Sequence, residues 1–288
     1  MKKKITYLLV LFLFLGVFSS PARVQAKSAQ DYTYIKISGK FDPACSGEAG
    51  VRQLNNIRAK AGKSKVIYSP ALEKTARSMV APFIVAGKNS KGYLKSPTAD
   101  YYDVASMMRK NIVSSSMIGF VSYAYSLTAV AKGASLEAIT NSHFSTTSPG
   151  VYGAYQYGAC VKYVPEGSKK AYIITLLSSQ SGSGVNVSSK QNVTYTIKVK
   201  TGALSKVKLT CKSPVYKKKS ATVTAQATLK GAYEKFRVKI VKNKTYKSSD
   251  KSVAKVSKDG KITGVSEGST IISLKIGAKN YRLRIKVS

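Results

Sequence analysis

The sequence of 288 residues predicts an α+β domain followed by an all-β sandwich. Apolar residues recur at helical spacing in the first half of the chain, and they alternate with polar residues in the last third. The segment at 179–192 is rich in serine and glycine, which is typical of a flexible linker. We therefore expect an N-terminal extension at 27–44, a first domain at 45–178 and a second domain at 193–288.

The first 26 residues have the layout of a secretory signal peptide. Three lysines precede an apolar run from Ile5 to Phe18, and the small residues of Val24-Gln25-Ala26 form a cleavage site. We expect cleavage after Ala26, with an uncleaved membrane anchor as the alternative. The rest of the chain has no apolar run of the roughly 18 residues that a membrane span needs, which excludes an integral membrane body.

Four helices are expected in the first domain, two of them early and two more at 99–111 and 135–141. Residues 49–61 place Val51, Leu54 and Ile57 on one helical face, and Gly62 is a typical stop. A second helix is expected to begin at Ser69-Pro70, because serine is a good cap and proline suits the first helical position.

Strands are expected on both sides of the linker. Residues 158–164 and 171–177 are rich in β-branched and aromatic residues, and the turn between them predicts an antiparallel hairpin. Alternation at 194–200 and 236–241 predicts half-buried strands in the second domain.

Part of the second domain carries a family pattern. It consists of Tyr246, Ser252-Val253-Ala254, Asp259-Gly260 and Glu267-Gly268-Ser269-Thr270. Asp259-Gly260 favours a hairpin turn between two of the short strands. The pattern resembles the bacterial immunoglobulin-like group 2 domain, which often has tryptophan where this chain has Tyr246. The resemblance implies an immunoglobulin-like sandwich, a module of surface proteins that serves adhesion or spacing and has no catalytic site.

The first domain carries a second pattern, formed by Leu54-Asn55, Arg58 and Gly62, then Tyr68-Ser69-Pro70, and then the segment 135–142. This pattern resembles the CAP superfamily, also called the SCP-like domain of secreted proteins. The resemblance implies an α-β-α sandwich. It also implies a cleft in which two histidines and two acids can bind a divalent metal.

The chain departs from the family at that cleft. Its one histidine, His143, directly follows Ser142, whereas the family has histidine three residues after the serine, where this chain has Ser145. A metal site needs several converging ligands, and Glu137 is the only acid nearby. We therefore expect Ser142 and His143 to mark a vestigial cleft without metal, cofactor or catalysis. A secreted hydrolase that uses this cleft is the alternative.

Three cysteines are present, Cys45, Cys160 and Cys211. Export makes a disulfide chemically accessible, and Cys45 and Cys160 bracket the first domain as the candidate pair. Three free thiols are the alternative. No Cys-x-x-Cys pair occurs, which argues against a thiolate metal site.

The formal net charge is +36, and it is +32 without residues 1–26, which hold four basic residues and no acids. Residues 190–288 hold 25 basic and four acidic residues, so this all-β tail carries +21 of the charge. Such a field attracts polyanions. For an exported protein we expect anionic wall polymers or surface glycans as partners, and no nucleic acid. A basic but merely solvated surface is the alternative.

Lysines and tyrosines interleave at two places in the second domain. Lys217, Lys218 and Lys219 follow Tyr216, whereas Lys242, Lys244 and Lys247 lie around Tyr246. These six lysines are the candidate polyanion-binding residues; guarding an exposed strand edge is their alternative role.

We therefore expect a secreted or cell-surface, non-catalytic binding or adhesion protein, whose first domain presents a cleft or a surface for a protein partner. A purely structural spacer is a further alternative.

Overall fold

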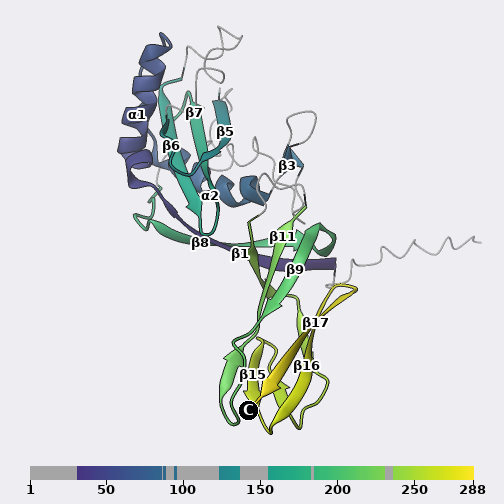
Figure 1. Cartoon of the computed structure of the whole chain (residues 1–288). Coiled ribbons are helices and arrows are strands. Elements are labelled where there is room, and N and C mark those ends of the chain that lie inside the picture. The colour runs from purple at the N-terminus through teal and green to yellow at the C-terminus, as the bar shows by residue number, and fades with distance from the viewer. Residues whose placement is uncertain are drawn as a thin grey trace, which may run out of the picture.

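The computed structural model describes residues 31–85, 87–88, 94–95, 123–136, 155–182, 185–230 and 236–288. The expected signal peptide with its cleavage site after Ala26, and the expected cleft residues Ser142 and His143, lie outside the described residues. In the described part the fold is mostly antiparallel β-sheet with two α-helices (Figure 1).

The N-terminal half supplies both helices. In chain order its elements are β1 (Tyr32–Phe41), the 3-10 helix at Pro43–Cys45, α1 (Gly47–Lys60), β2 (Ile67–Tyr68), α2 (Pro70–Val85), β3 (Gly87–Lys88), β4 (Leu94–Lys95), β5 (Tyr123–Ala131), β6 (Tyr157–Pro165) and β7 (Lys170–Ser178). The two early helices and the expected hairpin are confirmed, the hairpin as β6 and β7. The helix expected at 99–111 lies outside the described residues, as does most of the one expected at 135–141.

The two helices pack on opposite faces of the sheet formed by β5, β7 and β6. Val51, Leu54 and Ile57 of α1 share one apolar cluster with Cys160 and Ile173. The neighbouring residues of the two strands point the other way, because side chains alternate along a strand. Their cluster contains α2, through Leu72, Met79 and Phe83 with Val161 and Ile174.

In the described residues from 185 onward, the regular elements are strands and one short 3-10 turn. They are β8 (Asn192–Lys200), β9 (Leu204–Thr210), β10 (Ser220–Thr222), β11 (Thr224–Leu229), β12 (Val238–Lys242), β13 (Thr245–Ser248), β14 (Ala254–Val256), β15 (Lys261–Gly264), β16 (Gly268–Ile276) and β17 (Lys279–Val287), with a 3-10 turn at Thr201–Ala203. The expectation of an all-β C-terminal part is therefore confirmed.

β1 joins the two halves of the chain. Residues 27–44 were expected to form an extension, yet they contain this ten-residue strand. One edge of β1 pairs with β8 along its whole length, from Tyr32 opposite Lys200 to Lys40 opposite Asn192. The other edge pairs with β12 and then with β6, so the nine-stranded sheet crosses the expected linker (Figure 1). The expected division into two domains stays a prediction.

Two small sheets form the C-terminal sandwich, with β10, β15 and β14 on one side and β13, β16 and β17 on the other. Its interior contains Tyr246, Ile262, Ile272, Leu274 and Ile285, all nearly or fully buried. These residues belong to the same apolar cluster as α2, so one continuous core runs through the described molecule.

Candidate functional site

The six candidate lysines lie on several strands and turns of the C-terminal part. Lys217, Lys218 and Lys219 are exposed on a turn that is hydrogen-bonded to β15 and to the C-terminal residue. Lys247 is exposed on β13. Whether these lysines act together with Lys242 and Lys244 stays a prediction.

Lys242 and Lys244 contact aromatic rings. The Nζ atom of Lys242 lies 5.7 Å from the ring centroid of Tyr34, and that of Lys244 lies 5.0 Å from the ring centroid of Tyr246. Lys244 is half-buried, and burial lowers the pKa of its ammonium group. It also lies 3.3 Å from the Tyr246 hydroxyl. These contacts indicate that Lys244 packs against the sandwich rather than reaching for a ligand.

A coherent basic surface lies instead on the outer face of β13, β16 and β17. These three strands contain no acidic residue. Lys247 lies opposite Ser273, which in turn lies opposite Arg282, so their side chains share one face. Arg284 follows at two-residue spacing and therefore points the same way. We call this surface the basic face, and its cations are Lys247, Lys275, Arg282, Arg284 and Lys286.

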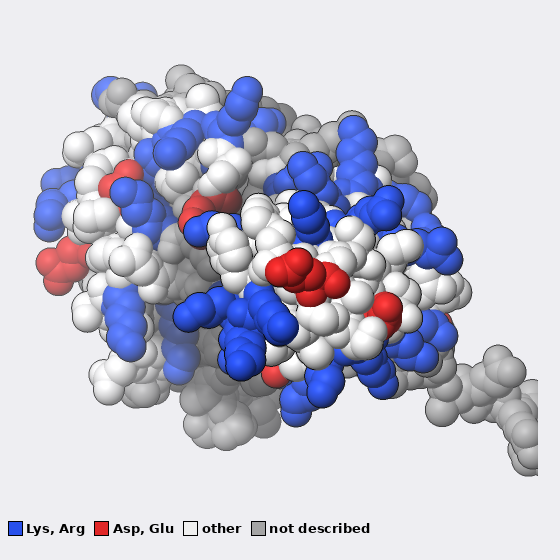
Figure 2. All heavy atoms as spheres, turned by 60° about the horizontal axis from the view of Figure 1, so that its bottom comes forward, with Lys and Arg blue, Asp and Glu red and all other residues white. Residues whose placement is uncertain are grey.

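All five cations of the basic face are exposed, and apolar groups lie beside them. Ile271, opposite Arg284, is 38% exposed. Tyr216, beside the end of β17, is 61% exposed. Figure 2 looks at this lower end of the molecule, where blue basic side chains predominate and red acidic ones are scattered. The surface therefore combines a strong positive field with a few apolar contact points.

Four of these five cations are not among the candidates predicted from the sequence, because that prediction rested on clusters of lysine along the chain. The available signal was the alternation at the C-terminus, where Arg282, Arg284 and Lys286 occupy every second position. In a strand with one buried face, such alternation places every cation on the other face.

The candidate disulfide residues Cys45 and Cys160 are free thiols in the structure, buried in the same apolar cluster. Burial raises the pKa of the Cys45 thiol to about 11 and that of Cys160 to about 12. A protonated thiol is a poor nucleophile, so burial disfavours the reactive thiolate form of both residues. The disulfide stays a prediction.

The described residues contain no cluster of three or more histidine, cysteine or acidic side chains that could hold a metal ion. In the same part of the chain, neither helix has the length and apolarity that crossing a bilayer requires.

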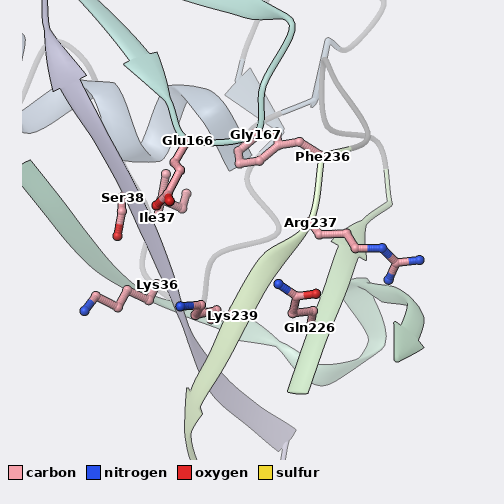
Figure 3. A pocket seen from close by; sticks show the side chains of 9 residues that line it. All are labelled: Lys36, Ile37, Ser38, Glu166, Gly167, Gln226, Phe236, Arg237 and Lys239. Atoms are coloured by element: carbon pink, nitrogen blue, oxygen red, sulfur yellow. The ribbon is translucent and has the colours of Figure 1, made fainter. Parts of the chain in front are cut away.

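A pocket of about 460 Å³ lies where β1, β12 and the turn between β6 and β7 meet (Figure 3). It is lined by Lys36, Ile37, Ser38, Glu166, Gly167, Gln226, Phe236, Arg237 and Lys239. None of these residues belongs to the candidates that the sequence indicated, because the pocket unites four segments distant in the chain. We call it the fork pocket.

No family model matches the chain, and no curated protein matches it. Among solved structures, the chain is similar to the S-layer protein rSbsC (31-844), with 14% identity and a TM-score of 0.24. That match covers 58% of this chain and 22% of the S-layer chain, so the present chain spans less than a quarter of that protein.

Proposed function

We propose that this protein is an exported, non-catalytic binding protein of the cell envelope, which attaches to anionic wall polymers through its basic face. The observation that carries the proposal is the row of five exposed cations on three strands without an acid. The signal-peptide layout of residues 1–26 supports export, and export favours wall polymers over nucleic acid as the polyanion.

The shape of the basic face favours an extended polymer over a small anion. Arg282, Arg284 and Lys286 form a line along β17, and alternate residues of a strand lie about 7 Å apart. A polyanion that lies along such a line can displace its counterions at several contacts at once. Ile271 and Tyr216 add apolar contacts for the carbon skeleton of the polymer.

The proposal includes the resemblances to the CAP superfamily and to the bacterial immunoglobulin-like group 2 domain. Helices on opposite faces of the sheet formed by β5, β7 and β6 support a CAP-like first domain. Two stacked antiparallel sheets support a group 2 immunoglobulin-like module at the C-terminus. We propose that the first domain is non-catalytic, because the chain has a single histidine where the CAP cleft needs two.

The test is co-sedimentation of the mature chain with purified Gram-positive-type cell walls, with and without teichoic acids, across a salt series. The variant replaces Lys275, Arg282, Arg284 and Lys286 with glutamine. Its matched control replaces four exposed cations distant from the basic face, Lys40, Arg52, Lys65 and Lys74, and so loses the same charge.

We expect binding that requires teichoic acid and weakens steeply with salt. In the basic-face variant the slope of log K against log salt should fall by up to about 3, since each lost phosphate contact removes about 0.7. The control variant should bind like the parent. If both variants bound equally weakly, net charge alone would explain the binding. If both bound walls without teichoic acids as well as walls with them, the proposal would be contradicted.

A further inference from the structure

The fork pocket arises from a change of partner along β1. Residues 34–36 of β1 pair with β12, whereas residues 39–41 pair with β6. Between them, Ile37 and Ser38 have no strand partner on that edge in the described structure. The carbonyl of Ser38 accepts a hydrogen bond from the Glu166 amide at 2.7 Å, which holds the turn between β6 and β7 above the gap. The sheet therefore divides here, and the pocket lies at the division.

The charged residues that line the pocket are mostly cations. Three cations, Lys36, Arg237 and Lys239, line it against one carboxylate, that of Glu166. In Figure 3, Lys36 and Arg237 extend to opposite ends, and Lys239 and Gln226 lie between them. The Nη1 atom of Arg237 donates a hydrogen bond to the Lys206 carbonyl at 3.2 Å, which holds one end of the cationic row in place.

The strand register places two of these cations opposite each other, and their repulsion destabilises the sheet. Lys36 lies directly opposite Lys239, and like charges in that position destabilise a sheet. Neither lysine takes part in the ion pairs found among the described residues, which are Glu73–Arg77 and Asp42–Lys162. Lys36 extends away from Lys239 (Figure 3), as two repelling ammonium groups would. A doubly charged anion between them would convert the repulsion into two favourable contacts.

The remaining residues of the pocket offer hydrogen-bonding and apolar groups beside the cations. Ser38, Gln226 and Glu166 offer hydroxyl, amide and carboxylate groups, which suit the hydroxyls of a polyol or sugar. Phe236 is half-buried and presents an apolar ring to a carbon skeleton. A volume of about 460 Å³ lies within the usual range of small-molecule sites, which is about 300–1,000 Å³.

We infer that the fork pocket binds a phosphorylated polyol or sugar. The phosphate lies between Lys36 and Lys239, and the hydroxyls face Ser38, Gln226 and Glu166. The site is separate from the basic face, so the inference stands even if that face binds no polymer. The lysine side chains are flexible enough to turn toward the phosphate when it arrives.

Calorimetric titration of the mature chain at low salt tests the inference, with glycerol 1-phosphate as the probe. Glycerol and inorganic phosphate are the comparison ligands. We expect saturable one-to-one binding of glycerol 1-phosphate, at least tenfold tighter than that of either comparison ligand. Lys239→Gln should weaken this binding at least tenfold. Lys255→Gln, which removes an exposed lysine from β14, should leave it unchanged.

Thermal unfolding provides a second readout that does not depend on calorimetry. Without ligand, Lys239→Gln should unfold at a slightly higher temperature than the parent, because it relieves the repulsion with Lys36. Glycerol 1-phosphate should raise the unfolding temperature of the parent and not that of the variant. The inference is overturned if no probe binds the parent, if glycerol or phosphate alone binds equally well, or if Lys239→Gln binds like the parent.

Discussion

At the scale of single residues, Glu73 is a buried carboxylate with two side-chain partners. Its side chain is 2% exposed and accepts a hydrogen bond from the Tyr68 hydroxyl at 2.6 Å. The Nε atom of Arg77 donates to it at 2.8 Å, and the Arg77 guanidinium lies 4.1 Å from the ring centroid of Phe41. Burial and the bond to Glu73 together raise the pKa of Tyr68. The carboxylate therefore ties β2 and α2 to the end of β1.

Glu73→Ala should lower the free energy of unfolding by about 3 kcal/mol, since it leaves a partly buried arginine without its partner. Urea unfolding followed by circular dichroism measures this loss. Glu73→Gln should lose less, because the amide oxygen still accepts from Tyr68. Glu267→Ala, at an exposed turn, serves as the control and should change stability by no more than about 0.5 kcal/mol. A loss below about 1 kcal/mol for Glu73→Ala would contradict this account.

The buried thiols make stability sensitive to alkaline pH. The folded pKa values of Cys45 and Cys160, about 11 and about 12, both lie above the ordinary value of 9.0. As the pH rises through 9, the unfolded chain releases these protons while the folded chain retains them. The stabilisation is thus complete below pH 8 and is lost as the pH rises toward the folded values.

Under reducing conditions, the urea midpoint should therefore fall between pH 7.5 and pH 9.5. A Cys45→Ala, Cys160→Ala double variant should be less stable at every pH but should lose most of this slope. An equally steep slope in the double variant would show that other groups cause it. The pH range stays below the titration of most lysines, whose loss of charge would act in the opposite direction.

At the scale of elements, α1 approaches β6 as closely as its backbone permits. A Cβ atom on Gly50 would lie 2.7 Å from the Cys160 carbonyl oxygen and 2.9 Å from the Cys45 carbonyl carbon. Both are backbone atoms, which cannot move aside as a flexible side chain can. The glycine is therefore required by packing, although it is a poor helix former.

Gly50→Ala tests which of the two effects is larger. Helix propensity alone would stabilise α1 by about 1 kcal/mol, whereas overpacking typically costs about 1–3 kcal/mol. We expect net destabilisation of about 1–2 kcal/mol in urea unfolding. Asn56→Ala, at an exposed position of the same helix, should instead be slightly stabilising. A gain in stability for Gly50→Ala would show that α1 and β6 can move apart.

At the scale of the whole molecule, β1 connects the two halves of the chain that lie on either side of the serine- and glycine-rich segment at 179–192. It pairs with β6 of the N-terminal half and with β8 and β12 of the C-terminal half. Thr33 of β1 also donates a side-chain hydrogen bond to the Lys242 carbonyl at 2.6 Å, across 209 positions in the chain. Ile35 and Ile37 belong to the continuous core. β1 is therefore a central strand of the long sheet.

A chain that begins at Asp42, without β1, should lose cooperative unfolding in calorimetry, because β6, β8 and β12 would each lose a partner. A chain that begins at Asp31 should unfold like the chain that begins at Lys27. If the Asp42 chain kept one full transition, β1 would be a dispensable extension. The same reasoning explains why wall binding is best tested with the full mature chain.

Local pattern was enough to predict part of this structure. Residues such as Val51, Leu54 and Ile57 lie within one or two helical turns, so their spacing reports one buried face directly. The hairpin of β6 and β7 was predicted for a similar reason, because its partners are joined by a short turn.

The candidate sites were harder to predict. The basic face needed the register of β13, β16 and β17, and the fork pocket needed β1, β6, β11 and β12 together. A cluster of lysines along the chain, such as Lys217 to Lys219, can be seen in the sequence. The basic face cannot, because its cations come from three strands.

The sequence by itself determined the two helices, the hairpin, the all-β C-terminal part and the strongly basic charge, since each depends on nearby residues or on composition. Only the tertiary structure decided that β1 spans both halves, that Lys36 meets Lys239, and that five cations share one face. The physical reason is that strand pairing is non-local. Its register depends on which buried faces fit together after the chain has folded back on itself, and no short window of sequence contains both partners.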